Sequence, residues 1–249
     1  MRGKWAAGAG EPESVPRAAL GPARPATVGA MPHPREVTVP TDAGPGRLLV
    51  SPAPAPSALL WLGHGAGGGA GARDLVALAE ELPRHGITVV RHEQPWVVAG
   101  RRVAPRPAAL DSAWLATAPA VRGLAAELPL VVGGRSAGAR VACRTAGAVA
   151  AAAVVCTAFP LHPPGRPERS RAEELGLAQV PVLVLQGTRD PFGSADEVAA
   201  SAPATEVVAV AGGDHGLKVA RSAPLGQEES LARLCAEVRR FLGGLATPG

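Results

Sequence analysis

Short apolar runs alternate with longer amphipathic segments along most of the chain. The runs are rich in Val, Leu and Ala, and several are continuous rather than alternating, which is typical of strands buried on both faces. We expect eight strands, at 36–40, 47–50, 58–62, 87–90, 128–132, 152–155, 180–185 and 206–210.

The segments between these runs predict helices at 73–82, 108–127, 137–148 and 228–242. In the last of them, apolar residues recur at helical spacing and form one stripe. Pro119 lies inside the second, so we expect that helix to be kinked or split there. The Pro-rich stretches that follow the fourth strand, up to about residue 107, and at 159–168 are expected to be irregular.

Strands alternating with helices indicate an α/β fold, with a mostly parallel sheet covered by helices on both faces. Residues 31–249 are expected to form one domain of this kind. Residues 1–30 are low in complexity and lack the apolar core of a secretory signal, so we expect a disordered tail, with Met31 as a possible true start.

Composition narrows the function class. The chain has 249 residues, 47% of them hydrophobic, and a net charge of +4. Its basic residues are scattered, which argues against nucleic-acid binding, and no apolar run is long enough to suggest a membrane span. Three cysteines, Cys143, Cys156 and Cys235, lie in apolar stretches. They predict buried free thiols in a reducing, cytoplasmic compartment.

A candidate nucleophile follows the strand at 128–132. Gly134, Ser136 and Gly138 form the pattern G-x-S-x-G between a predicted strand and a predicted helix. A serine held on such a sharp turn needs small neighbours, because the backbone is strained and packed closely. A serine hydroxyl also needs an oriented base, which predicts an acid and a histidine after later strands.

Both partners occur in the expected chain order. Asp190 lies five residues past the strand at 180–185, and His215 lies five past the strand at 206–210. The carboxyl ends of parallel strands meet at one edge of a sheet, so both should emerge beside Ser136. Asp214 is an alternative acid, but adjacent side chains point different ways, which favours Asp190.

The Gly-rich loop at 63–69 is a candidate oxyanion site. It follows a strand and precedes a helix, and its glycines allow backbone N–H groups to turn inward. We expect the donors to be the N–H groups of Ala66, or Gly65, and of Ala137, the residue after the nucleophile. His64 is expected to fix this loop by hydrogen bonding rather than to act as a base.

Together, the motifs GHGAGG, GRSAG, GTRDPFG and GGDHG resemble those of the α/β-hydrolase superfamily over about residues 35–243. The stretch at 159–168 resembles a dienelactone-hydrolase-like branch, although Phe159 stands where many relatives have tyrosine. That branch includes testis-expressed and histone-acetyltransferase-complex relatives in animals. The resemblance implies an eight-stranded sheet, a Ser–Asp–His triad and Leu-His-Pro-Pro-Gly in place of a large lid, hence a minimal cap or none.

Four other residues are candidates for the substrate pocket, because each lies near the carboxyl edge of the predicted sheet: His64, Trp96, Arg135 and His162. Arg135 could face an acidic substrate or pair with a carboxylate. His162 could line the pocket or lie in a Pro-rich loop with its polar groups satisfied. No cofactor is expected, and the isolated histidines do not form a metal-binding pattern.

We therefore expect a serine hydrolase that cleaves a small ester or thioester through an acyl-enzyme. One alternative is a catalytically silent hydrolase-like module that binds an unknown protein partner, because relatives in that branch act in complexes. A less favoured alternative is a dinucleotide-binding protein. Gly63, Gly65 and Gly68 fit G-x-G-x-x-G, and Glu93 follows the next strand, but this hypothesis leaves Ser136, Asp190 and His215 unexplained.

Overall fold

The structure, a computed structural model, describes residues 33–245. The expected tail at 1–30 and the possible start at Met31 lie outside the described residues.

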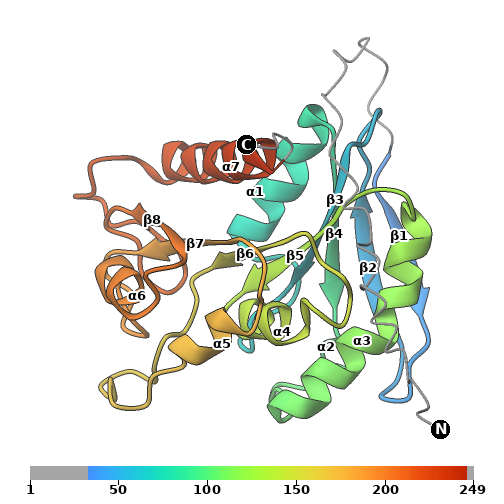
Figure 1. The fold of residues 1–249 in the computed structure, drawn as a ribbon, viewed down its shortest axis with the longest axis horizontal. Coiled ribbons are helices and arrows are strands. Elements are labelled where there is room, and N and C mark those ends of the chain that lie inside the picture. The colour runs from blue at the N-terminus through green and yellow to red at the C-terminus, as the bar shows by residue number, and fades with distance from the viewer. Residues whose placement is uncertain (1–32, 246–249) are drawn as a thin grey trace, which may run out of the picture.

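An eight-stranded sheet forms the centre of the molecule, in the order β1-β2-β4-β3-β5-β6-β7-β8 (Figure 1). β2 pairs antiparallel with β1 and with β4, and all other pairs are parallel. The strands are β1 Arg35–Val39, β2 Gly46–Ser51, β3 Ala58–Gly63, β4 Ile87–Glu93, β5 Leu130–Arg135, β6 Ala153–Thr157, β7 Val182–Gly187 and β8 Glu206–Val210.

Helices cover both faces of this sheet. In Figure 1, α1 and α7 lie above the sheet, and α2, α3, α4 and α5 lie below it. The helices are α1 Arg73–Glu81, continued by the short 3₁₀ turn η1 Leu82–His85, then α2 Pro95–Val98, α3 Pro107–Leu124, α4 Ala137–Thr145, α5 Ala172–Gly176, α6 Ala195–Ser201 and α7 Gln227–Gly244.

The core is divided by the sheet into two apolar clusters. Along β3, Leu59 and Trp61 pack into the cluster that includes residues of α3 and α4. Leu60 and Leu62 pack into the cluster that includes α1 and α7. Successive side chains of a strand point to opposite faces, so a run that is buried on both faces must be apolar throughout.

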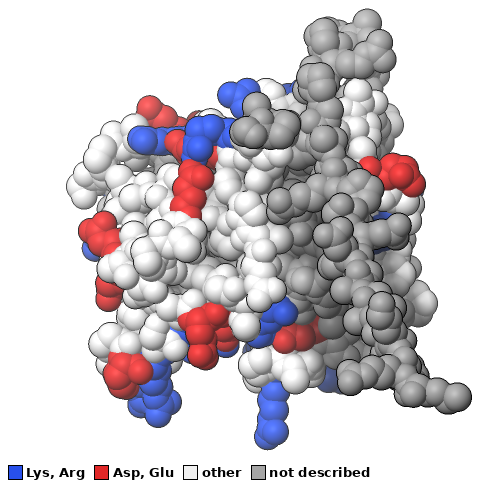
Figure 2. Space-filling model, viewed as in Figure 1, with Lys and Arg blue, Asp and Glu red and all other residues white. Residues whose placement is uncertain are grey.

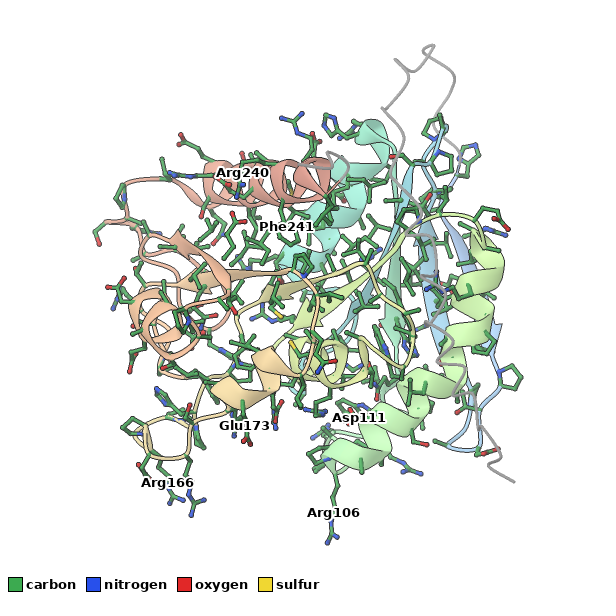
Figure 3. All side chains as sticks on the ribbon, in the orientation of Figure 1. Arg106, Asp111, Arg166, Glu173, Arg240 and Phe241 are labelled. Atoms are coloured by element: carbon green, nitrogen blue, oxygen red, sulfur yellow. The ribbon has the colours of Figure 1, made fainter. Side chains whose placement is uncertain are left out.

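α7 has one face buried against the sheet and one face exposed. Phe241, on the side of the helix that faces the sheet in Figure 3, is buried. Its neighbour Arg240 is exposed and pairs with Glu237 one turn earlier and with Glu206 at the start of β8. The helix therefore contributes one apolar face to the core, as its spacing predicts.

The expected fold class is confirmed, but β4 and β5 continue past their expected ends at Val90 and Val132. β4 reaches Glu93, and β5 runs through Gly133 and Gly134 to Arg135. A Cβ on Gly133 would lie 2.1 Å from the carbonyl oxygen of Val155 on β6. Here glycine is required by close strand packing and does not mark a loop.

The helices differ from expectation in two ways. α3 is one helix with Pro119 inside it, so of the two expected outcomes, a kink or a split, the split does not occur. Proline removes the hydrogen bond to the carbonyl four residues earlier, at Leu115, and Leu115 is exposed, so that carbonyl lies on the solvent side. Three short helices were not predicted: α2, α5 and α6. α6 begins with a capping box between Ser194 and Glu197, a signal that the sequence does contain.

Charge is distributed without a single dominant sign on the face in Figure 2, where basic and acidic residues are interspersed at the periphery. Over residues 33–245, none of the helices combines the length and the hydropathy needed to cross a membrane.

One buried histidine is part of an aromatic stack. The ring centroids of Trp61 and Trp114 lie 3.6 Å apart, and the ring of His92 lies 5.8 Å from that of Trp61. His92 is fully buried, and neither of its ring nitrogens has a hydrogen-bond partner among residues 33–245. Burial disfavours the charged imidazolium and lowers the pKa of His92 to about 3.

This buried imidazole predicts a loss of stability in acid. Between about pH 6.5 and pH 3 the unfolded chain binds a proton at His92 that the folded chain does not, so stability falls with pH. As the pH is lowered from about 6 to about 4, the free energy of unfolding of wild type should fall relative to that of His92→Leu by about 1.4 kcal/mol per pH unit. Denaturant titrations at each pH measure both values. The exposed-residue control His33→Gln should follow wild type, and a constant offset between His92→Leu and wild type would contradict the prediction.

Candidate active site

The loop at the end of β5 holds Ser136 in an unusual backbone conformation. Ser136 has φ 52° and ψ −110°, and it lies directly before α4. Its backbone N–H donates a hydrogen bond to the carbonyl of Thr157, 3.0 Å away on β6. A non-glycine residue at positive φ is strained by about 1–3 kcal/mol and persists only where its surroundings fix it.

Glycines at both flanks make this turn possible. A Cβ on Gly134 would lie 2.3 Å from the carbonyl oxygen of Gly63, and one on Gly138 would lie 2.4 Å from the same atom. The end of β3 therefore passes against both sides of the turn that carries Ser136. This close packing is the physical reason for the pattern G-x-S-x-G.

Two later loops bring a histidine and an aspartate to Ser136. Ser136 Oγ lies 3.0 Å from His215 Nε2, and His215 Nδ1 lies 2.8 Å from Asp190 Oδ2. Asp190 follows β7 and His215 follows β8, so the shared direction of the strands places both loops at one edge. The three residues that the motifs indicated are thus joined in one chain of hydrogen bonds.

Asp190 is fixed by neighbours that sequence reasoning missed. Gln186 Nε2 donates to Asp190 Oδ2 over 3.0 Å, and the backbone N–H of Phe192 donates to Asp190 Oδ1 over 2.8 Å. The Phe192 ring also stacks on the imidazole of His215, with centroids 4.1 Å apart. These contacts hold the carboxylate and restrict the imidazole ring. The stretch QGTRDPF contained both residues, but no spacing rule singles them out.

Asp214 is not the partner of this histidine. Its Oδ1 accepts hydrogen bonds from the backbone N–H groups of Gly216 and Lys218, at 2.7 and 2.9 Å. The carboxylate therefore shapes the turn after β8, while Asp190 contacts the imidazole.

Arg135 connects the turn of Ser136 to the loop of His215. Its Nη1 donates to Asp74 Oδ1 over 2.9 Å, and its Nη2 donates to the carbonyl oxygen of His215. Asp74 is fully buried and also accepts a hydrogen bond from Thr157 Oγ1 at 2.6 Å. Of the two possibilities weighed for Arg135, the structure thus has the pairing with a carboxylate.

The Gly-rich loop after β3 lies beside the nucleophile. A Cβ on Gly65 would be 3.4 Å from the Cβ of Ser136, and the next residue, Ala66, is exposed. The ring of His64 is engaged at both nitrogens: Nδ1 lies 2.8 Å from the carbonyl oxygen of Gly65, and Nε2 accepts from the backbone N–H of Gln94 over 3.2 Å. Burial lowers the pKa of His64, so a neutral imidazole fixes the loop.

A small hollow of about 10 Å³, room for about one water molecule, lies beside the turn that carries Ser136. Its lining includes residues on either side of the nucleophile turn and residues of α2 and α3, among them His64, Gly65, Gln94, Trp96, Leu110 and Ala137. Of the four residues weighed for a substrate pocket, His64 and Trp96 line this hollow.

The other two candidates lie elsewhere. Arg135 is held by Asp74, and it does not line the hollow. His162 also lies outside it; its Nδ1 is 3.0 Å from the carbonyl oxygen of Pro163 and its Nε2 is 3.4 Å from Glu197. Position after a strand brought both to the correct edge of the sheet, but it could not give the direction of either side chain.

Glu93, the acid that a dinucleotide site would need, is engaged within the protein. It pairs with Arg47, and its Oε1 accepts from the backbone N–H of Ala70 over 3.2 Å. Glu93 therefore stabilises the end of the Gly-rich loop through this hydrogen bond. Across residues 33–245, no three His, Cys, Asp or Glu side chains are grouped so that they could hold a metal ion.

Comparison with known proteins gives the class of protein that this sheet and site define. A match to a family described as alpha/beta hydrolase domain covers residues 56–243, and the chain belongs to that family. The search of curated proteins found no match.

Solved structures share the fold. A lidless α/β serine hydrolase from Xanthomonas campestris has a TM-score of 0.65 and 22% identity, covering 86% of this chain and 97% of that one. Dienelactone hydrolase from Anabaena variabilis has a TM-score of 0.67 and 14% identity, covering 86% and 98%. An α/β serine hydrolase homologue from Coxiella burnetii has a TM-score of 0.66 and 17% identity, covering 84% and 97%. The predicted superfamily and its dienelactone-hydrolase-like fold are confirmed.

The packing of Gly138 against β3 gives a prediction for stability. Gly138→Ala places a Cβ 2.4 Å from a backbone oxygen, so the turn or β3 must move. We expect the free energy of unfolding to fall by more than about 2 kcal/mol in denaturant titrations. Gly147→Ala is the matched control, because a Cβ there would have no neighbour within 4 Å. Equal stability of the two variants would contradict this account of the motif.

Proposed function

We propose that the protein is a serine hydrolase that cleaves small esters or thioesters through an acyl-enzyme. The observation that carries the proposal is the continuous hydrogen-bond chain from Ser136 through His215 to Asp190, with lengths of 3.0 and 2.8 Å. Family membership supports hydrolase chemistry in general. The proposed triad names the residues that would perform this chemistry.

The geometry suits the two half-reactions of acyl transfer. His215 Nε2 takes the proton of Ser136 as the hydroxyl oxygen attacks the acyl carbonyl. Asp190 keeps the Nδ1 proton of His215 in place and stabilises the imidazolium that forms. The imidazolium then protonates the departing alcohol or thiol. In the second half-reaction His215 activates water, which releases the acid and restores the serine hydroxyl.

The negative charge of the tetrahedral intermediate needs donors close to Ser136. Ala137 is the first residue of α4, so its backbone N–H has no helix bond to make and lies where the helix dipole favours an anion. The loop at Gly65 and Ala66 approaches from the other side, held by His64 and Glu93. We assign the oxyanion site to these backbone N–H groups.

The surroundings of Ser136 bear on the size of the substrate. The hollow beside its turn has a volume of about 10 Å³, room for about one water molecule, so it is far smaller than the roughly 300–1,000 Å³ typical of sites for drug-sized ligands. The segment between β6 and β7 contains only the short helix α5, so no large cap encloses the site. Both features favour a small substrate.

Removal of the nucleophile tests the proposal. Wild type should react with a fluorophosphonate probe and hydrolyse p-nitrophenyl acetate, and Ser136→Ala should do neither. The exposed-residue control Ser201→Ala should retain both activities. Asp190→Asn should lower kcat by a factor on the order of 10⁴, because the imidazole then loses its correct tautomer.

A folded wild type that neither reacts with the probe nor hydrolyses esters would overturn the assignment. That result would favour the alternative, a hydrolase-like module that works by binding a protein partner.

We further propose that residues 31–249 are sufficient as one domain. The first strand, β1, begins at Arg35, and the family match begins at residue 56. A chain that lacks residues 1–30 should therefore keep its melting temperature within about 2 °C and its kcat/KM within about twofold, as expected for a change outside the packed core. A large loss of either quantity would show that the first thirty residues belong to the domain.

A further inference from the structure

One hydrogen bond holds the backbone of the residue that carries the proposed base. The carbonyl oxygen of His215 accepts from Arg135 Nη2, and this is the sole hydrogen bond that the backbone of His215 makes within residues 33–245. The surrounding turn is shaped by Asp214, whose carboxylate accepts from the N–H groups of Gly216 and Lys218. The position of the His215 backbone therefore depends on the Arg135 guanidinium.

This guanidinium is fixed in turn by a buried carboxylate. Arg135 Nη1 donates to Asp74 Oδ1 over 2.9 Å, and Asp74, in the first turn of α1, is fully buried. The other oxygen of Asp74 accepts from Thr157 Oγ1 over 2.6 Å, and the carbonyl oxygen of Thr157 accepts from the backbone N–H of Ser136. One carboxylate is therefore connected to the loop of the base through Arg135 and to the nucleophile turn through Thr157.

Stability alone does not account for this ion pair. Taking two charges out of water costs free energy, and replacing a buried ion pair with apolar residues is often neutral or stabilising. The Thr157 hydroxyl also has a second acceptor, the carbonyl oxygen of Gly134 at 3.4 Å, so it would keep a partner without Asp74. A catalytic constellation, by contrast, must be held within about 0.5 Å of its productive geometry. Positional accuracy is the property that this ion pair can supply and an apolar pair cannot.

We propose that Asp74 and Arg135 are positioning residues that keep the imidazole of His215 aligned with the hydroxyl of Ser136. This inference rests on the proposed function, because it concerns the alignment of the same base and nucleophile. Arg135 acts through the backbone of His215, and Asp74 acts through Arg135. The planar fork of a guanidinium suits this role, because it donates to a carboxylate and to a carbonyl oxygen in one fixed geometry.

A second arginine ion pair, between α4 and α5, serves as the control. Arg140 pairs with Glu174, and the side chains of Arg135 and Arg140 are 14% and 21% exposed. Among the described residues, the guanidinium of Arg140 donates hydrogen bonds to Glu174 alone. Its replacement therefore removes an arginine of similar burial and leaves every contact of the proposed triad in place.

The kinetic experiment replaces the ion pair with apolar side chains. The double variant Asp74→Leu/Arg135→Met leaves no buried charge without its partner, so it should fold, which circular dichroism and denaturant titration check. Its kcat for p-nitrophenyl acetate should fall by at least about tenfold, up to a factor on the order of 10². KM should stay within about threefold of wild type, because both half-reactions use the same imidazole. The control Arg140→Met should keep both values within about threefold.

Arg135→Lys is the second variant, and it keeps a positive charge beside Asp74. A lysine ammonium has no planar fork, so it does not hold the carboxylate and the His215 carbonyl in one fixed geometry. Its kcat should fall by at least about fivefold while KM stays unchanged. A kcat equal to that of wild type in either folded variant would overturn the proposal.

A structural measurement tests the same pair without turnover. His215 Nδ1 lies 2.8 Å from Asp190 Oδ2, so its proton should give a downfield NMR resonance in wild type, assigned by its loss in His215→Ala. Exchange of this proton with water should be at least about tenfold faster in the double variant, because the loop that carries the imidazole is no longer held. Arg140→Met should leave the exchange rate unchanged. An equal rate in the double variant and in wild type would overturn the positioning role.

The two proposals fail in different ways. If wild type hydrolyses the ester and both variants match its kcat, the triad stands and the positioning role is wrong. If wild type neither hydrolyses the ester nor reacts with the fluorophosphonate probe, the proposed function is wrong, and proton exchange alone decides whether Asp74 and Arg135 position the imidazole.

Discussion

The close approach of two backbones at the end of β3 is the constraint on which the site depends. The carbonyl oxygen of Gly63 lies where a Cβ on either Gly134 or Gly138 would have to be. Only a chain without side chains at both positions can make the turn between them. That turn holds Ser136 at positive φ, and the strain is supported by strands on either side rather than by the loop itself.

The parallel sheet then gathers the remaining groups. β7 and β8 run in the same direction as β5, so the loops that follow them converge on the same edge and bring Asp190 and His215 to Ser136. On the other side, His64 and Glu93 hold the Gly-rich loop through hydrogen bonds to backbone atoms. Secondary structure thus sets the approximate positions, and a small number of buried polar contacts sets the distances.

The sequence predicts the parts of this arrangement that depend on periodicity and chain order. Short apolar runs predict the eight strands, and the continuous ones, such as those of β3, β6 and β7, follow from burial on both faces of a parallel sheet. The order of Ser136, Asp190 and His215 follows from the order of the loops. The sequence does not predict the direction in which side chains point. Arg135 and His162 lie after the correct strands but outside the hollow, and the contacts of Gln186 and Phe192 with Asp190 and His215 depend on packing that no local pattern encodes. The expected strand ends before Gly133 for the same reason, because the place of this glycine in β5 is set by its packing against β6.

Arg135 links the nucleophile turn to the loop of the histidine. It directly precedes Ser136 in the chain, and its guanidinium donates hydrogen bonds to the carbonyl oxygen of His215 and to the buried Asp74. The loops of Ser136 and His215 are therefore joined twice, once through the hydroxyl and the imidazole and once through this guanidinium.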